Sequence, residues 1–303
     1  MKKRVSLIGV SGYVSEKLLE LLSKHDKIEL TYLFSTSKAG MKLYDVYPSL
    51  KNKLDSNVEI QELDFDLINS SDLVFVIVPH GESKKIVEKI KTKVIDLSKN
   101  YRLEKTYGIP EIFHEQIKDS KFVANPGCYA TACILSVFPI KDYIEEVIFH
   151  GISGYSGAGR NAKVKFDYED NIIAYKLFDH HHLQEIEKII QRKITFLPHV
   201  VDVFSGILIT SVIKLEEQKE ISELKSTYFR FFNNYPLIKI VDYIPTTKEV
   251  LNKPFCKIHL AGYDKMGNLI VVSVIDNLMK GSASQAIQNM NLMVGLDSNY
   301  SLC

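Results

Sequence analysis

Apolar runs alternate with amphipathic segments through the first third of the chain. The runs are short and rich in Val, Ile, Leu and Phe, and they predict buried strands at residues 4–10, 28–34, 73–78 and 94–97. Helical periodicity predicts helices from about Val14 to Leu22 and from about Ser83 to Lys91. Apolar strands separated by helices indicate a parallel sheet that is covered on both faces. Because crossovers between parallel strands are right-handed, we expect a doubly wound α/β domain.

The pattern changes near Asn125. A strongly apolar helical run begins at Cys128, and we expect Pro139 to end it. Strands are then predicted at residues 147–153, 195–198, 206–215, 237–241, 256–264 and 269–276. Met266-Gly267-Asn268 predicts a hairpin turn between the last two strands, and a helix over 282–294 follows them. Several strands in succession with few helices indicate a second domain of α+β type with a mixed or antiparallel sheet.

The composition is that of a globular protein with a sizeable core. Of 303 residues, 46% are hydrophobic and 25% are charged, and 38 Lys and Arg nearly balance 37 Asp and Glu. No overall field therefore favours nucleic acid or a membrane surface as a partner. The apolar runs are too short for a membrane-spanning helix. Four cysteines without paired or metal-type spacing lead us to expect a cytoplasmic protein.

A glycine-containing turn follows the first predicted strand. In Gly9-Val-Ser11-Gly12-Tyr13-Val14-Ser15, the first glycine permits a tight turn and the second lets a pyrophosphate approach a helix N-terminus. Serine stands at the position of a third glycine, so the match to a dinucleotide fingerprint is partial. Its location in the first βα unit favours a cofactor site over an ordinary turn.

The residues after the second strand indicate which dinucleotide binds. No acidic residue ends that strand; Ser35, Thr36, Ser37 and Lys38 follow it instead. Hydroxyls and a cation suit a 2′-phosphate better than a bare ribose diol, which favours NADP(H) over NAD(H). An ordinary polar loop is the alternative. Pro79, at the end of the third predicted strand, is a further candidate for this site.

The segment Asn125-Pro-Gly-Cys128-Tyr-Ala-Thr places a cysteine directly at the start of a helix. Unpaired backbone N–H groups and the positive end of the helix dipole favour an anion there. Cys128 is therefore expected to ionise more readily than a free thiol, and the thiolate is the nucleophilic form. The alternative is a buried structural cysteine, since cysteine is one of the most often buried residues.

A second glycine-rich loop follows the strand predicted at 147–153. It contains Ser156, Gly157 and Arg160, with Lys163 close behind. We expect Gly157 to contact the cofactor, and Ser156 to contact the substrate together with the two cations. Glycines at this position allow backbone to approach a ligand, although an irregular turn needs them too. The two cations could hold a carboxylate or phosphate, or could be solvated surface charges.

Three adjacent histidines, His180, His181 and His182, precede a predicted helix. Adjacent side chains on a helix do not converge on one ion, and no nearby Cys or His completes a zinc set, so we expect no metal site. A histidine that titrates near neutrality suits both thiol activation and proton delivery. His199 is a second candidate, for which a structural role is the stronger alternative.

Longer motifs occur in a fixed order along nearly the whole chain. They include Gly9–Tyr13, Thr36-Ser-Lys-Ala-Gly40, Tyr107-Gly-Ile-Pro-Glu111, Ala124-Asn-Pro-Gly-Cys-Tyr-Ala-Thr131, Ser153-Gly-Tyr-Ser-Gly-Ala-Gly-Arg160, His180–Ile186 and Lys280-Gly-Ser-Ala-Ser-Gln-Ala-Ile-Gln-Asn289. This series resembles the N-acetyl-γ-glutamyl-phosphate reductase family, together with the similar reductases of carrier-protein-linked lysine biosynthesis.

The resemblance implies NADPH-dependent reduction of an acyl phosphate to an aldehyde, with phosphate released, in arginine or lysine biosynthesis. It implies a thioester on Cys128 and a fold similar to glyceraldehyde-3-phosphate dehydrogenase. A Rossmann-type NADP domain at 1–127 would be completed by residues 281–303, with a catalytic and dimerisation domain at 128–280. The substrate would be free N-acetylglutamyl phosphate, or an aminoadipyl or glutamyl phosphate on a small acidic carrier protein. We also expect a homo-oligomer, either a dimer or a tetramer.

The resemblance also implies roles for single residues. His180 or His182 would hold or return a proton, because the family motif has histidine at both positions with arginine between them. Asn289 would lie near the nicotinamide, and Asn125 would contact the substrate.

The chain departs from the family pattern at several positions. His181 replaces the family's arginine in the triplet, and Gln184 replaces its proline. Ser205 replaces an arginine, so another cation must bind the substrate anion if that arginine normally does so. Aspartate-semialdehyde dehydrogenase is the alternative within the same chemistry, and a nucleotide-binding paralogue without turnover is the alternative outside it.

Overall fold

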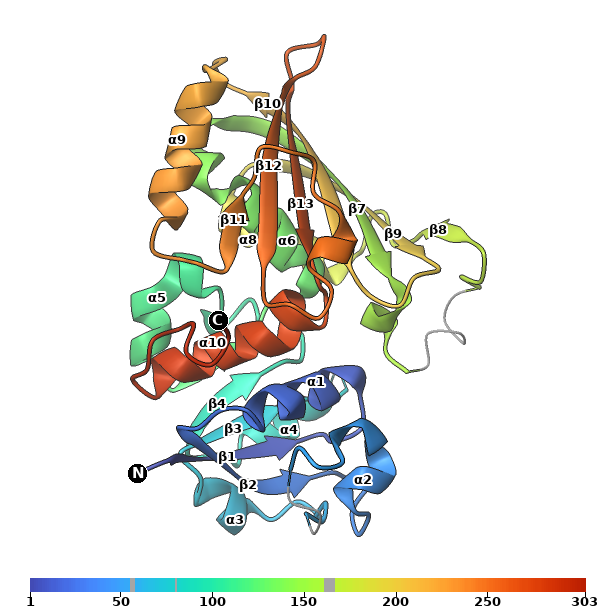
Figure 1. Cartoon of the computed structure of the whole chain (residues 1–303), viewed down its shortest axis with the longest axis vertical. Helices are drawn as coiled ribbons and strands as arrows, with labels where there is room; N and C mark the ends of the chain where they lie inside the picture. The colour runs from blue at the N-terminus through green and yellow to red at the C-terminus, as the bar shows by residue number, and fades with distance from the viewer. Residues whose placement is uncertain (55–57, 80, 161–166) are drawn as a thin grey trace. The chain divides into compact units, whose positions relative to one another are not determined.

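The computed structural model describes residues 1–54, 58–79, 81–160 and 167–303. The chain forms two compact units, the first from Met1–Pro126 and Ser282–Cys303, the second from Gly127–Gly281. The first unit thus combines the blue N-terminal strands with the red helix α10 of Figure 1. Among the described residues, no helix has the length and apolarity needed to cross a membrane.

The first unit contains a parallel sheet with the strand order β2-β1-β3-β4-β6-β5. Its strands are β1 (Lys3–Ile8), β2 (Ile28–Phe34), β3 (Leu73–Val76), β4 (Lys93–Asp96), β5 (Thr106–Tyr107) and β6 (Phe122–Ala124). Its helices are α1 (Tyr13–Leu22), α2 (Leu43–Val46), η1 (Pro48–Leu50), α3 (Phe65–Asn69), α4 (Glu82–Val87), α5 (Pro110–Asp119) and α10 (Ser284–Met293). Because β2 and β3 lie on opposite sides of β1, the strand order reverses there. Open α/β sheets bind ligands at such a point.

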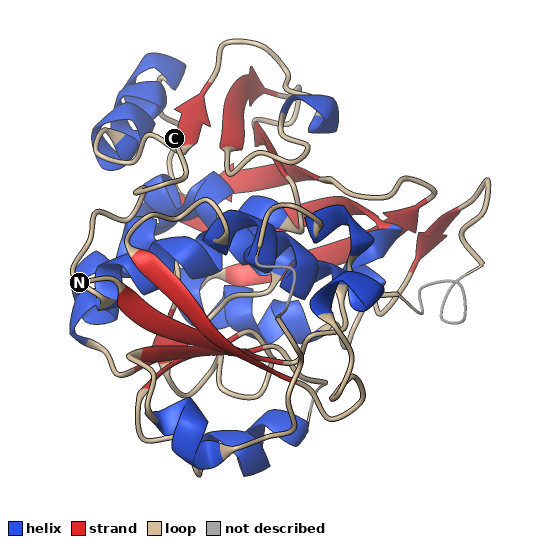
Figure 2. Cartoon of the chain, turned by 60° about the horizontal axis from the view of Figure 1, so that its bottom comes forward, coloured by secondary structure: helices blue, strands red, loops and turns tan. Residues whose placement is uncertain are grey.

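Both faces of this sheet are buried, as alternate residues of β3 show. Leu73 and Phe75 pack in a core with residues of α1 and α10, whereas Val74 and Val76 pack with residues of α3 and α4. Figure 2 shows the strands of the sheet fanning out with helices on either side. The predicted doubly wound α/β arrangement is therefore confirmed.

Four predicted elements of this unit end earlier than expected. Strand β1 stops at Ile8 rather than residue 10, and β4 stops at Asp96 rather than residue 97. Strand β3 stops at Val76, shortly before Pro79, which has no N–H to donate to a sheet. Helix α4 stops at Val87, because Lys89 and Ile90 donate to carbonyls three residues back rather than four.

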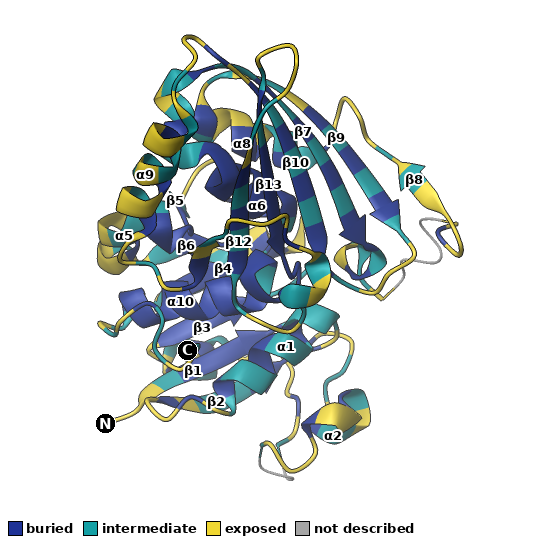
Figure 3. Ribbon diagram, turned by 45° about the horizontal axis from the view of Figure 1, so that its top comes forward, coloured by how far each residue is buried: buried dark blue, intermediate teal, exposed yellow. Residues whose placement is uncertain are grey.

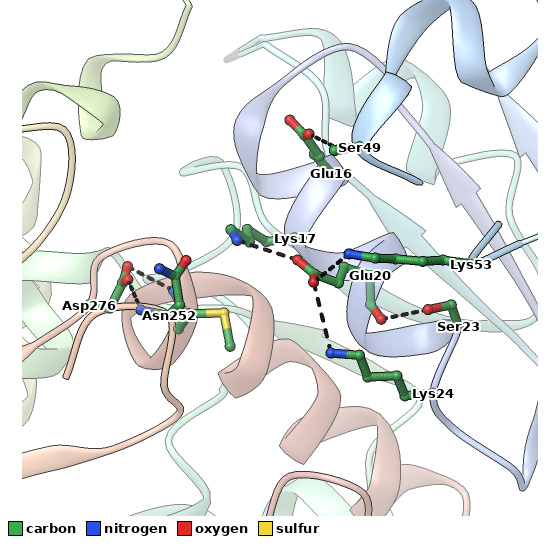
Figure 4. A network of polar contacts seen from close by, with 10 residues as sticks. Glu16, Lys17, Glu20, Ser23, Lys24, Ser49, Lys53, Asn252 and Asp276 are labelled. Carbon is green, nitrogen blue, oxygen red and sulfur yellow. Dashed lines mark hydrogen bonds and ion pairs between the residues drawn. The ribbon is translucent and has the colours of Figure 1, made fainter. Parts of the chain in front are cut away.

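Ion pairs between charged side chains connect α1 to the segment around Lys53 (Figure 4). The Glu20 carboxylate lies 2.8 Å from Lys53 Nζ, 3.3 Å from Lys17 Nζ and 3.8 Å from Lys24 Nζ. The hydrogen bond from Lys53 is the main reason that the pKa of Glu20 lies below its usual value. The segment that follows α2 is thereby tied to the helix that begins at the glycine turn.

The second unit contains a mixed sheet with the order β11-β12-β13-β10-β7-β9-β8. Its strands are β7 (Ile144–Gly154), β8 (Ile172–Ala174), β9 (Lys193–Val201), β10 (Ile207–Leu215), β11 (Ile238–Ile240), β12 (Cys256–Tyr263) and β13 (Leu269–Ile275). Its helices are α6 (Cys128–Val137), η2 (Phe138–Tyr143), η3 (Tyr155–Ala158), α8 (His181–Ile190), α9 (Ile221–Phe232), η4 (Thr247–Glu249) and the π-helical turn η5 (Met279–Ala283). The pairs β7–β9 and β11–β12 are parallel and the other pairs are antiparallel. This confirms the predicted α+β class of the second part.

The two faces of the second sheet differ in burial. Helix α6 packs on β10 and β13, and Val147, Phe149 and Ile209 on that side are fully buried. The alternate residues on the other side, such as Ile148 and Leu208, stay partly exposed. Figure 3 shows this alternation of dark blue and teal along β7, β9 and β10.

Candidate active site

A pocket of about 200 Å³ lies in the first unit, at the carboxyl ends of β1, β2 and β3. Residues predicted to contact the cofactor supply part of its lining, namely Gly9, Ser11, Ser35, Ser37 and Pro79. The remaining lining residues are Ile8, Thr36, Ile77, Val78, Glu82 and Ile86. The pocket therefore occupies the switch point of the sheet, where open α/β folds bind their ligands.

Gly9 is required by the geometry of the turn beside this pocket. Its φ is +102°, and a Cβ added there would lie 1.9 Å from the carbonyl oxygen of Ile77. Ser15, which stands in place of the third glycine, is fully buried and donates its hydroxyl to the Gly9 carbonyl oxygen over 2.7 Å. The partial fingerprint thus still gives a closed turn, because a side-chain hydrogen bond fixes the helix to the strand.

Of the other predicted cofactor residues in the first unit, Gly12, Tyr13 and Val14 lie beside the glycine turn, and Lys38 lies outside the pocket lining. Gly12 immediately precedes α1, and Tyr13 and Val14 are its first residues, so the backbone N–H groups of a helix N-terminus lie beside the turn. Lys38 does not line the pocket. Glu82, the first residue of α4, does line it, although the sequence pattern gave no reason to single it out.

Asn289 of α10 forms a buried amide cluster with Asn125, also within the first unit. Its Nδ2 donates to the Gly108 carbonyl oxygen over 3.0 Å and to Asn125 Oδ1 over 2.9 Å. Asn289 is fully buried, and its Oδ1 has no hydrogen-bond partner among the described residues. A buried acceptor of this kind fits an amide donor such as the nicotinamide carboxamide.

In the second unit, Cys128 is the first residue of α6. Gly127 occupies the N-cap position, and the other nine residues of the helix are buried while Cys128 is half-buried. The thiol therefore lies at the positive end of a buried helix and retains access to solvent. This placement matches the arrangement expected of an ionised cysteine.

Gly281 packs closely against Cys128, and a backbone hydrogen bond to Asp276 fixes its position. A Cβ added to Gly281 would lie 2.7 Å from Cys128 Cβ. The Gly281 N–H donates to the Asp276 carbonyl oxygen over 2.9 Å, and the Asp276 carboxylate accepts from Leu278 N and Asn252 N at 2.8 and 2.7 Å. Figure 4 includes the contact of Asp276 with Asn252.

His182 packs against the residue that precedes the thiol. A Cβ added to Gly127 would lie 2.1 Å from His182 Nε2. Glu185 Oε2 accepts the Gly127 N–H over 2.9 Å, and its Oε1 lies 4.0 Å from His182 Nε2. The spacing of three residues between His182 and Glu185 on a predicted helix was a signal for this carboxylate, which sequence reasoning did not use.

His180 has a different position, at the N-cap of α8. Its Nδ1 accepts the backbone N–H of His182 over 3.2 Å, and its Nε2 lies 3.3 Å from the Tyr175 hydroxyl. Burial is the main cause that lowers the pKa of His180 to about 4, so the ring is neutral at neutral pH. His181 stacks on this ring, with centroids 4.8 Å apart.

His199 projects from the partly exposed face of the second sheet, away from α6. Its Nδ1 donates to the Leu197 carbonyl oxygen over 3.1 Å, and its ring centroid lies 4.6 Å from that of His150. It therefore does not join the cluster formed by His180 and His182.

The predicted anion-binding loop is described as far as Arg160. Ser156 is buried and accepts a hydrogen bond from Asn277 Nδ2 over 2.9 Å. Gly157 and Arg160 are exposed. Lys163 lies outside the described residues.

Comparison with known proteins agrees with this architecture. Residues 4–120 match the family model described as semialdehyde dehydrogenase, NAD binding domain, and residues 128–277 match semialdehyde dehydrogenase, dimerisation domain. Both matched segments lie within the two units of the structure.

Solved structures share the fold at low sequence identity. An aspartate semialdehyde dehydrogenase II from Vibrio cholerae has a TM-score of 0.78 at 18% identity, with 97% of this chain and 99% of that chain covered. A probable aspartate-semialdehyde dehydrogenase from Pseudomonas aeruginosa has a TM-score of 0.80 at 16% identity, with the same coverage. These similarities concern the fold alone.

Sequence relatives are closer. N-acetyl-gamma-glutamyl-phosphate reductase from Campylobacter jejuni subsp. jejuni serotype O:23/36 is 36% identical, with 100% of this chain and 98% of the relative covered. The protein of the same name from Methanococcus maripaludis strain C5 is 37% identical, with 99% and 98% covered. The chain therefore belongs to the N-acetyl-gamma-glutamyl-phosphate reductase family, as its motifs indicated.

Proposed function

We propose that this protein is an NADPH-dependent reductase that converts N-acetylglutamyl phosphate to the corresponding semialdehyde and releases phosphate. The observation that carries this proposal is the placement of Cys128 at the start of α6, with His182 and Glu185 packed against the preceding residue. The relatives that align over the full chain are named for the same activity.

The Cys128 thiolate is the nucleophile. Its sulfur attacks the carbonyl carbon of the acyl phosphate, an S–C bond forms, the C–O bond to phosphate breaks, and phosphate leaves. The resulting thioester divides one difficult reaction into two easier ones. The N–H groups at the start of α6 favour the thiolate and can donate to the oxyanion of each tetrahedral intermediate.

His182 is the acid and base of this reaction rather than His180. The Nδ1 of His180 is an acceptor for a backbone N–H, and burial keeps its ring neutral. His182 instead lies against Gly127, next to the thiol, with Glu185 near its Nε2. A carboxylate near an imidazole stabilises the imidazolium that forms when the ring takes up a proton.

The first unit has the features that a dinucleotide requires. Gly9, Ser11 and the start of α1 would hold the pyrophosphate, Ser35 and Ser37 the 2′-phosphate, and Asn289 the nicotinamide amide. When bound, NADPH supplies the hydride for the thioester carbon. The hydroxyls in the pocket, without an acidic residue at the end of β2, favour the phosphorylated cofactor.

Ser156 and Arg160 are the candidates for holding the anionic part of the substrate. Arg160 is exposed and offers a planar guanidinium, which suits a carboxylate or phosphate. Ser205 stands where the family has a further arginine, so we propose Arg160, which the family motif shares, as the cation that remains for the substrate anion. Lys163 is proposed as its neighbour from the sequence alone.

The substrate is free rather than presented on a carrier protein. The chain is nearly neutral, with a formal net charge of +1, and its relatives are named for the free acyl phosphate. Turnover on a carrier-linked acyl phosphate at a rate equal to that on the free compound would contradict this choice.

A second copy of the chain is the expected partner. The second unit matches a dimerisation domain, and one face of its sheet bears partly exposed Ile148, Ile152 and Leu208. We place the interface on this face, since apolar surface on an open sheet gains stability when covered.

Turnover in the reverse direction tests the proposed function. With N-acetylglutamate semialdehyde, phosphate and NADP⁺ as reactants, the enzyme should reduce NADP⁺. The NADPH that forms should be detected by its absorbance at 340 nm. Cys128→Ser should abolish the signal. Cys133→Ala is the matched control, because Cys133 lies in the same helix, is fully buried, and has a pKa raised by that burial.

Three outcomes would contradict the proposal. The first is full activity of Cys128→Ser, which would remove the nucleophile. The second is activity with aspartate semialdehyde in place of the N-acetylglutamate compound, which would favour the related dehydrogenase. The third is NADPH binding without turnover of either compound, which would identify a paralogue without catalysis.

A further inference from the structure

Backbone hydrogen bonds join two loops of the second unit at one of the predicted substrate residues. The Gly154 N–H donates to the Gly206 carbonyl oxygen over 2.9 Å, and the Ser156 N–H donates to the Phe204 carbonyl oxygen over 3.0 Å. The second of these loops contains Ser205, which stands where the family has arginine. The position of Ser156 relative to this loop is therefore fixed by the main chain.

The side chain of Asn277, which follows β13, bridges the same two loops. Asn277 is 2% exposed, its Oδ1 accepts the Gly206 N–H over 2.8 Å, and its Nδ2 lies 2.9 Å from Ser156 Oγ. A backbone N–H can only donate, so the amide atom that faces Gly206 must be the oxygen. The amide nitrogen, which can only donate, must then face Ser156.

This amide orientation determines what the Ser156 hydroxyl can do. Ser156 Oγ accepts a proton from Asn277 and finds no acceptor there for its own proton. Ser156 is 3% exposed, and no residue in the described part of the chain accepts that proton. A buried hydroxyl left in this state fits an acceptor on a ligand, and an anionic oxygen is the strongest acceptor of this kind.

The segment that carries Asn277 also contacts the thiol. The preceding residue, Asp276, accepts the Gly281 N–H at its carbonyl oxygen over 2.9 Å, and a Cβ added to Gly281 would lie 2.7 Å from Cys128 Cβ. Residues 276–281 thus touch Ser156 at one end and Cys128 at the other. A ligand that accepts from Ser156 is therefore expected to be the molecule that reacts with the thiol.

We propose that Asn277 is a positioning residue that makes Ser156 a donor to an anionic oxygen of the substrate. The inference rests on the proposed function and deepens it, because it determines which kind of group the substrate presents to Ser156. Phosphate and carboxylate oxygens share the required chemistry, and the proposed substrate carries both groups. An N–H group at this position would face a second donor and is disfavoured.

The reverse reaction separates the two anionic groups, because phosphate and the semialdehyde are then different reactants. Ser156→Ala should raise the KM for one of them about tenfold or more, since a hydrogen bond to a charged group is lost. The kcat at saturation should be retained, as expected when an interaction is equal in the ground and transition states. A higher KM for phosphate assigns the donor to phosphate, and a higher KM for the semialdehyde assigns it to the carboxylate.

Asn277→Asp tests the orientation directly. Aspartate still accepts the Gly206 N–H, but its other oxygen accepts the Ser156 proton and turns it away from the substrate. The KM for the same reactant should therefore rise as it does in Ser156→Ala. Asn277→Ala, which leaves the hydroxyl free to rotate, should raise this KM by less.

Two controls separate the effect of orientation from that of the added charge. The double variant with Ser156→Ala and Asn277→Asp should have a KM well below the product of the two single effects, because both changes remove one donor. A charge that acts independently of Ser156 would instead give the product and overturn the role of Asn277. Asn234→Asp makes the same chemical change at an exposed position and should leave both KM values unchanged.

The outcomes distinguish this inference from the proposed function. Unchanged KM values in Ser156→Ala, with the wild-type melting temperature retained, would overturn the donor. A rise in Ser156→Ala without a rise in either Asn277 variant would overturn the positioning role. Calorimetric titration with inorganic phosphate and with N-acetylglutamate measures binding without catalysis. Weaker binding by Ser156→Ala supports the donor even if the wild-type protein turns over no semialdehyde, a failure that would refute the proposed function alone.

Discussion

The imidazole of His182 lies so close to the backbone of Gly127 that no side chain can be accommodated at position 127. A Cβ on Gly127 would lie 2.1 Å from His182 Nε2, and the imidazole is itself buried against Tyr129. The position of the imidazole relative to the thiol thus depends on the absence of one methyl group. Gly281 has the same relation to Cys128 itself, with 2.7 Å to its Cβ.

Gly127→Ala should therefore lower kcat about a hundredfold, because a displacement of about 1 Å has effects of that size. The affinity for NADPH should be retained, since the pocket lies wholly within the first unit. Steady-state kinetics together with cofactor titration would show this difference. A normal kcat in a variant that folds would mean that His182 has no part in turnover.

Ser35→Asp should change the cofactor preference toward NADH. Ser35 lines the pocket at the end of β2, and a carboxylate there would repel a 2′-phosphate and accept from a ribose diol. The KM for NADPH should rise at least about tenfold while that for NADH falls. Thr31→Asp adds the same charge on β2 outside the pocket and should change neither value. A retained preference for NADPH would exclude Ser35 from phosphate binding.

Helix α8 begins with an imidazole in the place usually taken by Ser, Thr or Asp. His180 is buried and caps the helix through Nδ1, and burial lowers its pKa to about 4. An unfolded histidine has a pKa near 6.5, so the unfolded chain binds the proton more tightly. The free energy of unfolding must therefore fall as the pH falls from about 6.5 to about 4.

This acid sensitivity gives a prediction for His180→Asn. Asparagine is a good N-cap and does not titrate. Between about pH 6.5 and 4, the free energy of unfolding of the variant should therefore fall by up to about 3 kcal/mol less than that of the wild type. Denaturant unfolding at a series of pH values between 7 and 4 would measure this slope. An unchanged slope would mean that His180 is protonated in the native state.

The elements that the sequence predicted well are long and strongly periodic. Strand β2 has the bounds expected for it, and the hairpin at Gly267 joins β12 to β13, with the glycine at a φ of +84°. Helix α5 was missed because most of its residues are polar, and its backbone also departs from helical angles at Phe113. Helix α9 was missed because the exposed Phe229 obscures the buried positions that recur every fourth residue.

The site was predictable only in part, for a related reason. Cys128 and the histidines were recognisable from local chemistry, since each lies at the start of a helix. Their partners come from contacts between distant segments, as when Glu185 accepts the Gly127 N–H. Tyr175 is a further example, because its hydroxyl lies 3.3 Å from His180 Nε2 although no local pattern singled it out.

In the molecule as a whole, the partly exposed face of the second sheet is the surface that we propose for contact with a second copy. Registered strands place His150 between Thr210 and Leu197, and His259 faces Val272 at the other end of the same row. On this face, the central strands carry apolar Ile148, Ile152, Leu208 and Val212. A row of charged residues, Lys193, Glu146 and Lys214, crosses the same face further along the strands.

Ile148→Lys should convert the predicted dimer to a monomer. An uncompensated charge in the centre of an apolar interface carries a large desolvation cost. Light scattering after size exclusion would report the mass. Phe229→Lys, which adds the same charge to an exposed position on α9, should leave the mass unchanged. Loss of the dimer in the α9 variant alone would move the interface to the helical side.

Acid should weaken the same association. Burial is the main cause that lowers the pKa of His150, and the neighbouring His199 lowers it further. Covering the face would increase this burial, so protonation of His150 at acid pH should favour separated copies. His150→Gln should make the dissociation constant less dependent on pH in sedimentation measurements. An equal dependence in the variant would exclude His150 as the titrating group.

The discontinuity of the first unit has a consequence during synthesis on the ribosome. Helix α10 is buried along its whole length in the core that also contains α1, yet it emerges only after every residue of the second unit. Until α10 is synthesised, the core face of the first sheet that this helix covers stays exposed. The second unit is one uninterrupted stretch of chain and can fold first. A nascent chain that pauses before Ser282 would present this exposed face to chaperones.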